Sequence, residues 1–178
     1  MTISSQENDE MFESVTLDPT IWVDQARRLL ISAQLPLDEL NKAKLLTPSN
    51  PNERSQKILC FMPTYMMLAG FALENVIKGL IVCRLPEPRQ VKDLKKFFKH
   101  DLVSIIPNDI PVSQEENDLL KRLAAFTIWN GRYPMPTEAK HYNNAVLNEL
   151  LCYKSGDENR VKDLFHRFER LITNEYEG

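Results

Sequence analysis

The chain has 178 residues, of which 43% are hydrophobic and 26% are charged, and this is the ordinary composition of one globular domain. Its formal net charge of −3 argues against a uniformly basic nucleic-acid binder, so any phosphate-binding surface has to be local. The 3 cysteines form no CxxC pair, which argues against a disulfide framework and a zinc site and favours a reducing compartment.

The N-terminal segment gives no sign of export. Residues 1–15 are polar and acidic, without the basic start and the apolar core of a signal peptide. No apolar run reaches the roughly 20 residues that are needed to span a bilayer. We therefore expect a cytoplasmic protein without membrane contact, in which a flexible leader over residues 1–16 precedes a single helical domain over residues 17–178.

Apolar residues recur at helical spacing along most of the chain. We predict an all-α fold, a helical bundle. The first helix begins after Asp18, a suitable N-cap, with Pro19 at its first position. Pro36 is expected to end it, and residues 37–46 are expected to form a short second helix. The apolar face of the first helix contains Ile21, Trp22, Ala26, Leu29, Leu30 and Ala33.

The longest predicted helix occupies residues 53–85, after a loop that we expect around residues 47–53. Pro63 is expected to kink this helix or to split a short leading helix from it. Gly70 and Gly79 each cost a helix roughly 1 kcal/mol relative to alanine, so we expect them to allow another helix to approach closely.

The second half of the chain begins with a short amphipathic helix over residues 91–102, which carries lysines on its polar side. Residues 113–130 follow as a helix, because Ser113 and Glu116 have the spacing of a capping box and Gly131 suits the end.

The C-terminal part contains one ambiguous segment and one clear helix. Residues 138–153 favour a helix, although their last part, residues 145–153, also fits a short strand. Residues 155–176 predict the last helix, with a buried face of Val161, Leu164, Phe165, Phe168, Leu171 and Ile172.

Glu74 and Lys78 lie four residues apart in one of the most apolar stretches of the chain. On an exposed helix such a pair contributes only about 0.2–0.5 kcal/mol. Two interpretations are open. The pair lies either at the polar edge of an amphipathic helix or at a packed interface, where each charge needs a partner to offset its desolvation.

His100 and Asp101 follow the lysine-rich segment directly. A histidine can transfer protons near neutral pH, and Asp101 would then orient it. The alternatives are that Asp101 caps the next helical turn and that His100 is an ordinary surface residue.

The segment over residues 129–136 combines aromatic faces, a forked cation and two prolines. Such a stiff segment can hold Arg132 toward a phosphate or a carboxylate, and Arg132 is a candidate partner for Glu74, with Tyr133 supplying a flat face beside it. The alternative is a structural latch that closes one helix pair over another.

Arg160 and His166 are a further candidate pair, on the last helix. Six residues correspond to about 600° of rotation, so the two side chains lie roughly 120° apart around the helix axis. A shared site would need a dimer seam or local unwinding, and otherwise both are surface residues. His141 has no discernible partner. The chain has no glycine-rich phosphate loop, HExxH motif or Cys/His cluster, and we expect no metal and no cofactor.

Three segments, LAGFALENVIKGLIV, FFKHDLVSI and IWNGRYPMP, occur in this order. Together they resemble the HEPN superfamily, and within it a subgroup with an ExxxK helix, a His-Asp-Leu turn and an Arg-Tyr-Pro loop. The resemblance covers residues 64–175 and leaves the first sixty unexplained. It implies an antiparallel bundle of four to five helices, to which the first sixty residues would add further N-terminal helices. Members are commonly homodimers, and many are metal-independent endoribonucleases of toxin–antitoxin, phage-defence or RNA-processing systems.

The resemblance also implies site residues. Nucleases of this superfamily carry Arg and His separated by four to six residues at a site between protomers, so Arg160 and His166 would be catalytic. Val161 departs from the polar residue that usually follows the arginine. Alternatively, a groove that binds RNA or nucleotide without cutting it would be lined by Glu74, Lys78, His100 and Arg132. The RNA backbone would contact Lys92, Lys95, Lys96 and Lys99.

Two hypotheses of different classes follow. The first is an RNA-directed protein that cleaves RNA. The second is a non-enzymatic helical dimer that binds a nucleotide or a partner protein, with an antitoxin or a nucleotidyltransferase as the implied partner. A helical fold hosts many functions, so the fold class alone does not choose between them.

Overall fold

The computed structural model describes residues 5–45 and 51–176, and every regular element within these ranges is helical. The prediction of an all-α helical bundle is therefore confirmed. The α-helices are α1 (Ser5–Thr16), α2 (Pro19–Leu45), α3 (Pro51–Cys83), α4 (Val91–Leu94), α5 (Leu102–Ile105), α6 (Gln114–Ala125), α7 (Ala139–Leu147) and α8 (Asp157–Tyr176). A 3₁₀ turn, Lys95–Phe97, extends α4, and a π-helical segment, Phe126–Asn130, extends α6.

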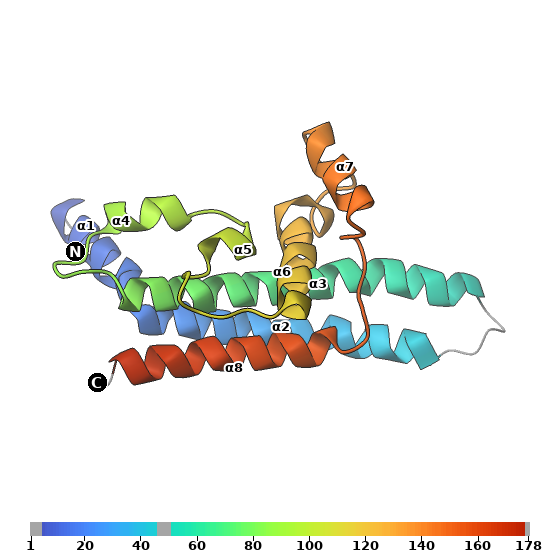
Figure 1. Ribbon diagram of the computed structural model, residues 1–178, viewed down its shortest axis with the longest axis horizontal. Coiled ribbons are helices and arrows are strands. Elements are labelled where there is room, and N and C mark those ends of the chain that lie inside the picture. The colour runs from blue at the N-terminus through green and yellow to red at the C-terminus, as the bar shows by residue number, and fades with distance from the viewer. Residues whose placement is uncertain (1–4, 46–50, 177–178) are drawn as a thin grey trace.

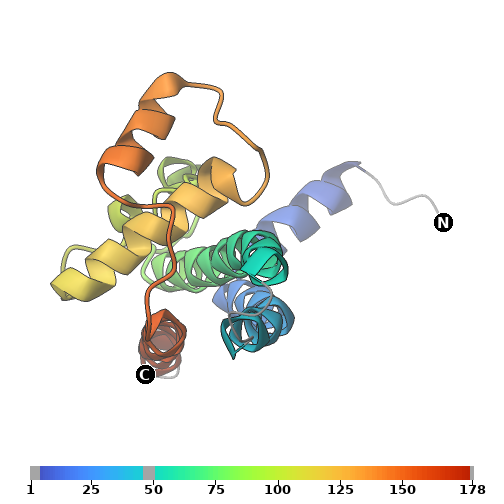
Figure 2. The same cartoon turned by 90° about the vertical axis from the view of Figure 1, so that its right-hand side faces the viewer.

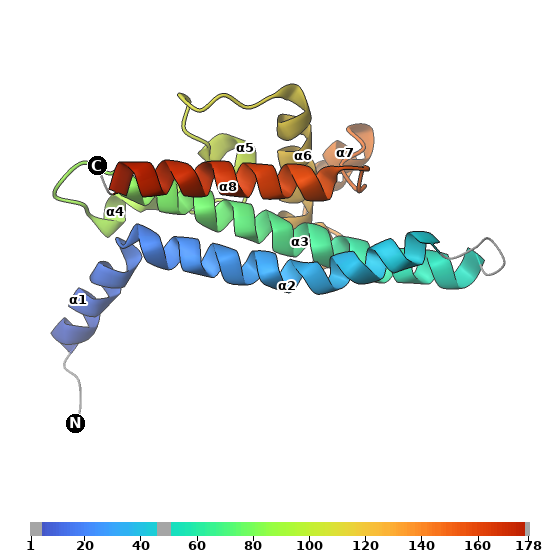
Figure 3. The same cartoon turned by 90° about the horizontal axis from the view of Figure 1, so that it is seen from below.

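Three long helices run alongside one another, as Figures 1 and 3 show. α2 and α3 form an antiparallel hairpin, and α8 packs against α3 in the same direction as α3. α6 crosses α3 steeply, and the short α4 and α5 lie on the same side of α3 as α6. Seen nearly end-on in Figure 2, α3 lies between α2, α8 and α6, while α7 projects from the body.

The core is centred on α3. Leu73, Val76, Ile77 and Leu80 are fully buried there, and the face predicted for the last helix packs against them, with only Leu171 partly buried. Burial of this kind contributes about 1.5–3 kcal/mol per large apolar side chain, which makes α3 the central element of the fold.

The two glycines of α3 lie where other helices approach closest. A Cβ at Gly70 would lie 2.5 Å from Thr127 Cγ2, at the junction with α6. A Cβ at Gly79 would lie 3.2 Å from Trp22 Cβ on α2 and 3.3 Å from Ile172 Cδ1 on α8. The prediction that these glycines allow close helix approach is confirmed.

Pro36 does not end the first helix, contrary to the prediction, and α2 continues through it to Leu45 as one element. A proline inside a helix removes one hydrogen bond and costs about 3 kcal/mol. Pro36 is itself buried, and Leu37 and Leu40 after it pack into the core. This packing offsets the local cost, so the separate helix expected over residues 37–46 is part of α2.

Pro63 likewise does not divide α3, which runs unbroken from Pro51 to Cys83. Of the loop expected over residues 47–53, residues 47–50 lie outside the described residues. Residues 51–53 belong to the first turn of α3. The helix ends at Cys83, two residues before the predicted end at residue 85.

α3 is also long and apolar enough, by composition, to cross a membrane over Asn52–Cys83. However, 78% of its most apolar window is buried inside the fold, as in the core helix of a bundle. The length and hydropathy of α3 are therefore only weak evidence that it spans a membrane.

The basic helix expected over residues 91–102 is much shorter than predicted. It consists of α4 and the 3₁₀ turn, which ends at Phe97. Leu94 is buried, but Phe98 is half exposed and packs against Trp22, with ring centroids 6.4 Å apart. The chain then turns at His100 and enters α5.

The helix predicted from residue 113 is confirmed, including its capping box: Ser113 Oγ accepts from the Glu116 amide, and Glu116 accepts from the Ser113 amide. The ambiguous segment over residues 138–153 contains α7, and no strand occurs there. α1 occupies most of the expected leader, and all its side chains from residue 6 to residue 15 are exposed.

Candidate functional site

Glu74 and Lys78 are both buried in the middle of the fold, with 4% and 7% of their surfaces exposed. Lys78 Nζ donates to Glu74 Oε1 at 2.6 Å, across one turn of α3. Of the two interpretations, the packed interface is the one that the structure shows. Each charge of this pair compensates the other. Removal of either side chain would leave the remaining charge buried without a partner, which destabilises the fold.

The second oxygen of this carboxylate binds a histidine. Glu74 Oε2 lies 2.9 Å from His100 Nδ1, and the two residues are 26 positions apart in the chain. The ring of Phe71 packs edge-on against His100, with centroids 5.9 Å apart. Lys78 Nζ also lies 5.4 Å from the centroid of the Phe98 ring, which covers it. Packing of α5 through Leu102 and Ile105 brings His100 to this place.

His100 is held on one side and open on the other. A carboxylate only accepts hydrogen bonds, so Nδ1 carries the proton in the contact with Glu74. Nε2 has no partner among the described residues, and 46% of the side chain is exposed. The arrangement of a buried carboxylate, an oriented imidazole and an accessible Nε2 is that of a general base or acid.

Arg132 does not bind Glu74, and that expectation was wrong. Its Nη2 donates to the carbonyl of Thr127 at 2.6 Å and to the carbonyl of Ile128 at 2.8 Å. The π-helical segment ends here and leaves carbonyls without amide partners, and these draw the guanidinium.

Arg132 nevertheless lies in the same neighbourhood as His100. Its guanidinium carbon is 6.0 Å from the centroid of Phe71, whose ring His100 also contacts, and 5.5 Å from the centroid of Tyr133. Its Nε and Nη1 have no acceptor within the described part of the chain. Tyr133 is exposed. The loop thus has the contacts of a latch and retains donors for an anion.

Asp101 does not orient His100 through a hydrogen bond, and it does not cap α5 with its side chain. It is exposed, and its backbone carbonyl accepts from the amide and the hydroxyl of Ser104. The residue that orients His100 is Glu74, which sequence spacing alone could not pair with it.

The structure keeps Arg160 and His166 apart. Arg160 folds back to the N-terminal end of α8, where its Nη1 donates to the carbonyl of Ser155 at 3.3 Å. His166 is exposed, and its Nδ1 lies 3.2 Å from Glu169 Oε2. The other oxygen of Glu169 accepts from Arg27 Nε on α2 at 2.7 Å. Within one chain, the two predicted catalytic residues therefore have separate partners.

The four lysines expected to contact RNA are Lys92, Lys95, Lys96 and Lys99, and all are exposed. None of them forms an ion pair with a described residue. They lie on and after α4, in the segment that leads to His100 (Figure 1).

A second buried ion pair was missed in the sequence. Arg122 Nη2 donates to Asp157 Oδ1 at 2.5 Å, and the two residues are 4% and 1% exposed. The Lys154 amide donates to the other oxygen of Asp157. A signal existed, because Arg122 lies on the apolar face of α6, three residues after Leu119. This pair connects α6 to the start of α8 and is structural.

Comparisons of the chain with models of protein families, with curated proteins and with solved structures find no match. Within residues 5–45 and 51–176, no group of three or more His, Cys, Asp or Glu side chains is arranged to hold a metal ion. Functional interpretation therefore depends on the chemistry of the site itself.

Proposed function

We propose that this protein is a HEPN-like, RNA-directed protein of the cytoplasm that cleaves RNA without a metal ion, in a toxin, defence or RNA-processing system. One observation carries the proposal: His100 is oriented through Nδ1 by the buried Glu74 and keeps Nε2 accessible. The ordered resemblance of three segments to the HEPN superfamily supports the same class.

The reaction needs a base, an acid and a cation. His100 Nε2 would take the proton of a ribose 2′-hydroxyl, and the 2′-oxygen would attack the adjacent phosphorus while the bond to the 5′-oxygen breaks. The leaving 5′-oxygen would take a proton from the imidazolium or from water. Arg132, whose Nε and Nη1 have no acceptor among the described residues, would stabilise the charge of the phosphorane-like transition state.

This assignment differs from the one that the resemblance implies. Arg160 and His166 stay a prediction, because their site would form between two protomers. The test is cleavage of total RNA by purified protein in the presence of a chelator. We expect His100→Ala to reduce the rate about 100-fold or more, and Arg132→Ala to act similarly.

His166→Ala is the matched control, because His166 is also exposed and also contacts a glutamate. Thermal melts of all variants would verify that each remains folded. Full activity of His100→Ala would contradict the proposal. Loss of activity in both Arg160→Ala and His166→Ala, with His100→Ala active, would instead place the reaction at a dimer seam.

The lysine segment supplies a second test. Binding to single-stranded RNA should weaken as salt rises, with about 0.7 counterions released per phosphate contact. Replacement of all four lysines by alanine should lower the slope of log affinity against log salt by about 3. An unchanged slope would exclude this segment from the RNA-binding surface.

The alternative proposal is a non-enzymatic helical module that forms a homodimer and binds a nucleotide, or a partner such as an antitoxin or a nucleotidyltransferase. One observation favours it: apolar side chains are exposed along α1 and the first half of α2, among them Met11, Phe12, Val15, Ile21 and Ile31. Light scattering of the wild type and of Phe12→Ser/Ile31→Ser tests the dimer. A wild-type monomer would contradict it.

A further inference from the structure

A cavity of about 510 Å³ lies between the C-terminal part of α6, the π-helical segment and α7. It is partly open to solvent, and its apolar lining combines three alanines, Ala124, Ala125 and Ala145, with the larger side chains of Ile128, Trp129 and Leu150. The volume is within the range of small-ligand sites and well above what a single ion occupies. The three alanines leave room beside the larger side chains for a flat ring of nucleobase size.

Trp129 lines this cavity and has only 4% of its surface exposed. Its indole N–H finds no acceptor within the described part of the chain, whereas the indole of Trp22 donates to the Thr16 carbonyl at 2.9 Å. The Trp129 nitrogen is not among the fully buried side-chain atoms that lack a partner in the described part of the chain, so it is accessible although the ring is buried. Indole N–H groups in such positions usually have an acceptor. The Trp129 N–H is therefore a donor that water or a ligand in the cavity can accept from.

The amide groups of α7 add a donor and an acceptor to the lining. Asn148 Nδ2 donates to Asn144 Oδ1 and to the Asn144 carbonyl, both at 2.9 Å. This orients the pair and leaves Asn144 Nδ2 and Asn148 Oδ1 unpaired. An adjacent donor and acceptor of this kind match the edge of a nucleobase.

The remaining polar lining includes a lysine, a histidine and an aspartate. Lys121 Nζ lies 3.9 Å from Asp118 Oδ1, and His141 Nε2 lies 3.8 Å from Glu138 Oε1. Both distances are too long for a hydrogen bond, so both nitrogens are available to a phosphate in the cavity. Asp101 also lines the cavity and directly follows His100, so their Cα atoms are about 3.8 Å apart. The cavity therefore reaches the turn that carries His100, and Ile128, whose carbonyl accepts from Arg132, also lines it.

We infer that this cavity binds one nucleotide of the RNA strand and reads its base. The base lies against Ala124, Ala125 and Ala145. Trp129 and the two asparagines meet its edge, and Lys121 or His141 meets a phosphate. The inference rests on the proposed function, because the nucleotide in the cavity is taken to lie next to the bond that His100 cleaves. Base preference at the cut is then set by α6 and α7.

The direct test is calorimetric titration of the full chain with the four ribonucleoside monophosphates. We expect one of them to bind best, Trp129→Phe to weaken that binding about fivefold, and Asn144→Ala to change the order of the four bases. Trp129→Phe keeps an aromatic ring and removes the N–H, and Asn144 is exposed enough that its truncation spares the fold.

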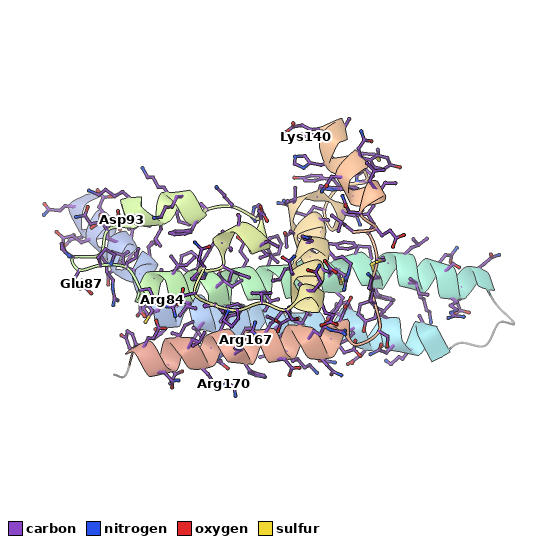
Figure 4. The ribbon with its side chains drawn as sticks, viewed as in Figure 1. Arg84, Glu87, Asp93, Lys140, Arg167 and Arg170 are labelled. Atoms are coloured by element: carbon purple, nitrogen blue, oxygen red, sulfur yellow. The ribbon has the colours of Figure 1, made fainter. Side chains whose placement is uncertain are left out.

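Lys140→Ala is the matched control, since Lys140 lies at the outer end of α7, points away from the body in Figure 4 and does not line the cavity. It should bind all four nucleotides as the wild type does. The inference would be overturned if none of the four nucleotides bound to the wild type. It would also be overturned if the wild type, Trp129→Phe and Asn144→Ala bound them equally.

The same variants in the RNA assay separate this inference from the proposed function. Cleavage that depends on His100 but has unchanged base preference in Asn144→Ala and Trp129→Phe would overturn the inference alone. Weaker nucleotide binding in both variants, with no RNA cleaved by the wild type, would support the pocket and remove the proposed catalysis.

Discussion

Glu74 Oε2 lies 2.9 Å from His100 Nδ1, and this contact joins the middle of α3 to the turn before α5. The same carboxylate binds Lys78 with its other oxygen. One buried acid therefore serves two purposes, since it compensates a buried ammonium and orients an accessible imidazole.

Replacement of Glu74 should destabilise the fold through Lys78. Glu74→Gln leaves the Lys78 ammonium buried without a carboxylate, so we expect the free energy of unfolding to fall by about 3 kcal/mol. Urea denaturation near neutral pH measures this. Glu74→Gln/Lys78→Met should be more stable than Glu74→Gln alone, because the uncompensated charge is gone.

The control for this prediction lies on the same helix. Lys57 Nζ is 3.2 Å from Glu53 Oε1 with the same four-residue spacing, but these side chains are 37% and 47% exposed. Glu53→Gln should therefore cost only about 0.5 kcal/mol or less. If Glu74→Gln and Glu53→Gln lowered the free energy of unfolding equally, burial would not explain how much the Glu74 pair stabilises the fold.

The ion pair of Arg122 and Asp157 should be as important for stability. Arg122→Met keeps the apolar stem but leaves the Asp157 carboxylate with only the Lys154 amide as donor. We expect a loss of about 3 kcal/mol in the free energy of unfolding. Arg170→Met is the control, because Arg170 is exposed and points away from the other helices in Figure 4. A similar stability of both variants would contradict this role.

The close approach at Gly70 predicts a pair of variants that compensate each other. Gly70→Ala places a Cβ 2.5 Å from Thr127 Cγ2 and should cost about 1–2 kcal/mol, despite the better helix propensity of alanine. Thr127→Ser removes that methyl group and keeps the hydroxyl that donates to the Ala124 carbonyl. Gly70→Ala/Thr127→Ser should recover most of the loss in thermal unfolding. Failure to recover would locate the strain elsewhere, at the Leu123 carbonyl 3.3 Å away.

Glu169 predicts a pH dependence of stability. Burial raises its pKa, but hydrogen bonds with His166 and Arg27 outweigh burial, and the pKa lies below the ordinary value of 4.5. A carboxylate with a lowered folded-state pKa stabilises above its unfolded pKa and loses this contribution as pH falls through the folded pKa. Glu169→Gln should thus cost about 0.5–1 kcal/mol near neutral pH.

The difference between wild type and Glu169→Gln should shrink as the pH falls below 4.5, and urea denaturation at several pH values measures it. A difference that stays constant down to about pH 3 would show that Glu169 acts through packing and not through its charge.

The elements that the sequence predicted well are those defined by neighbours in the chain. The capping box of Ser113 and Glu116 is confirmed because both partners lie within one turn. The buried face of α8 follows from its own periodicity. By contrast, the effect of Pro36 was predicted wrongly, since the burial of Leu37 and Leu40 in the core is a tertiary term that exceeds a local penalty.

The sequence by itself determined the helical class, the presence of a charged pair in an apolar helix and the closeness of helices at Gly70 and Gly79, because each depends on spacing within one segment. Only the tertiary structure decided which charges meet. Glu74 and His100 are separated by 26 residues, and Arg122 and Asp157 by 35. Such pairs form where helix packing excludes water, and packing is a property of the whole bundle and not of any one helix.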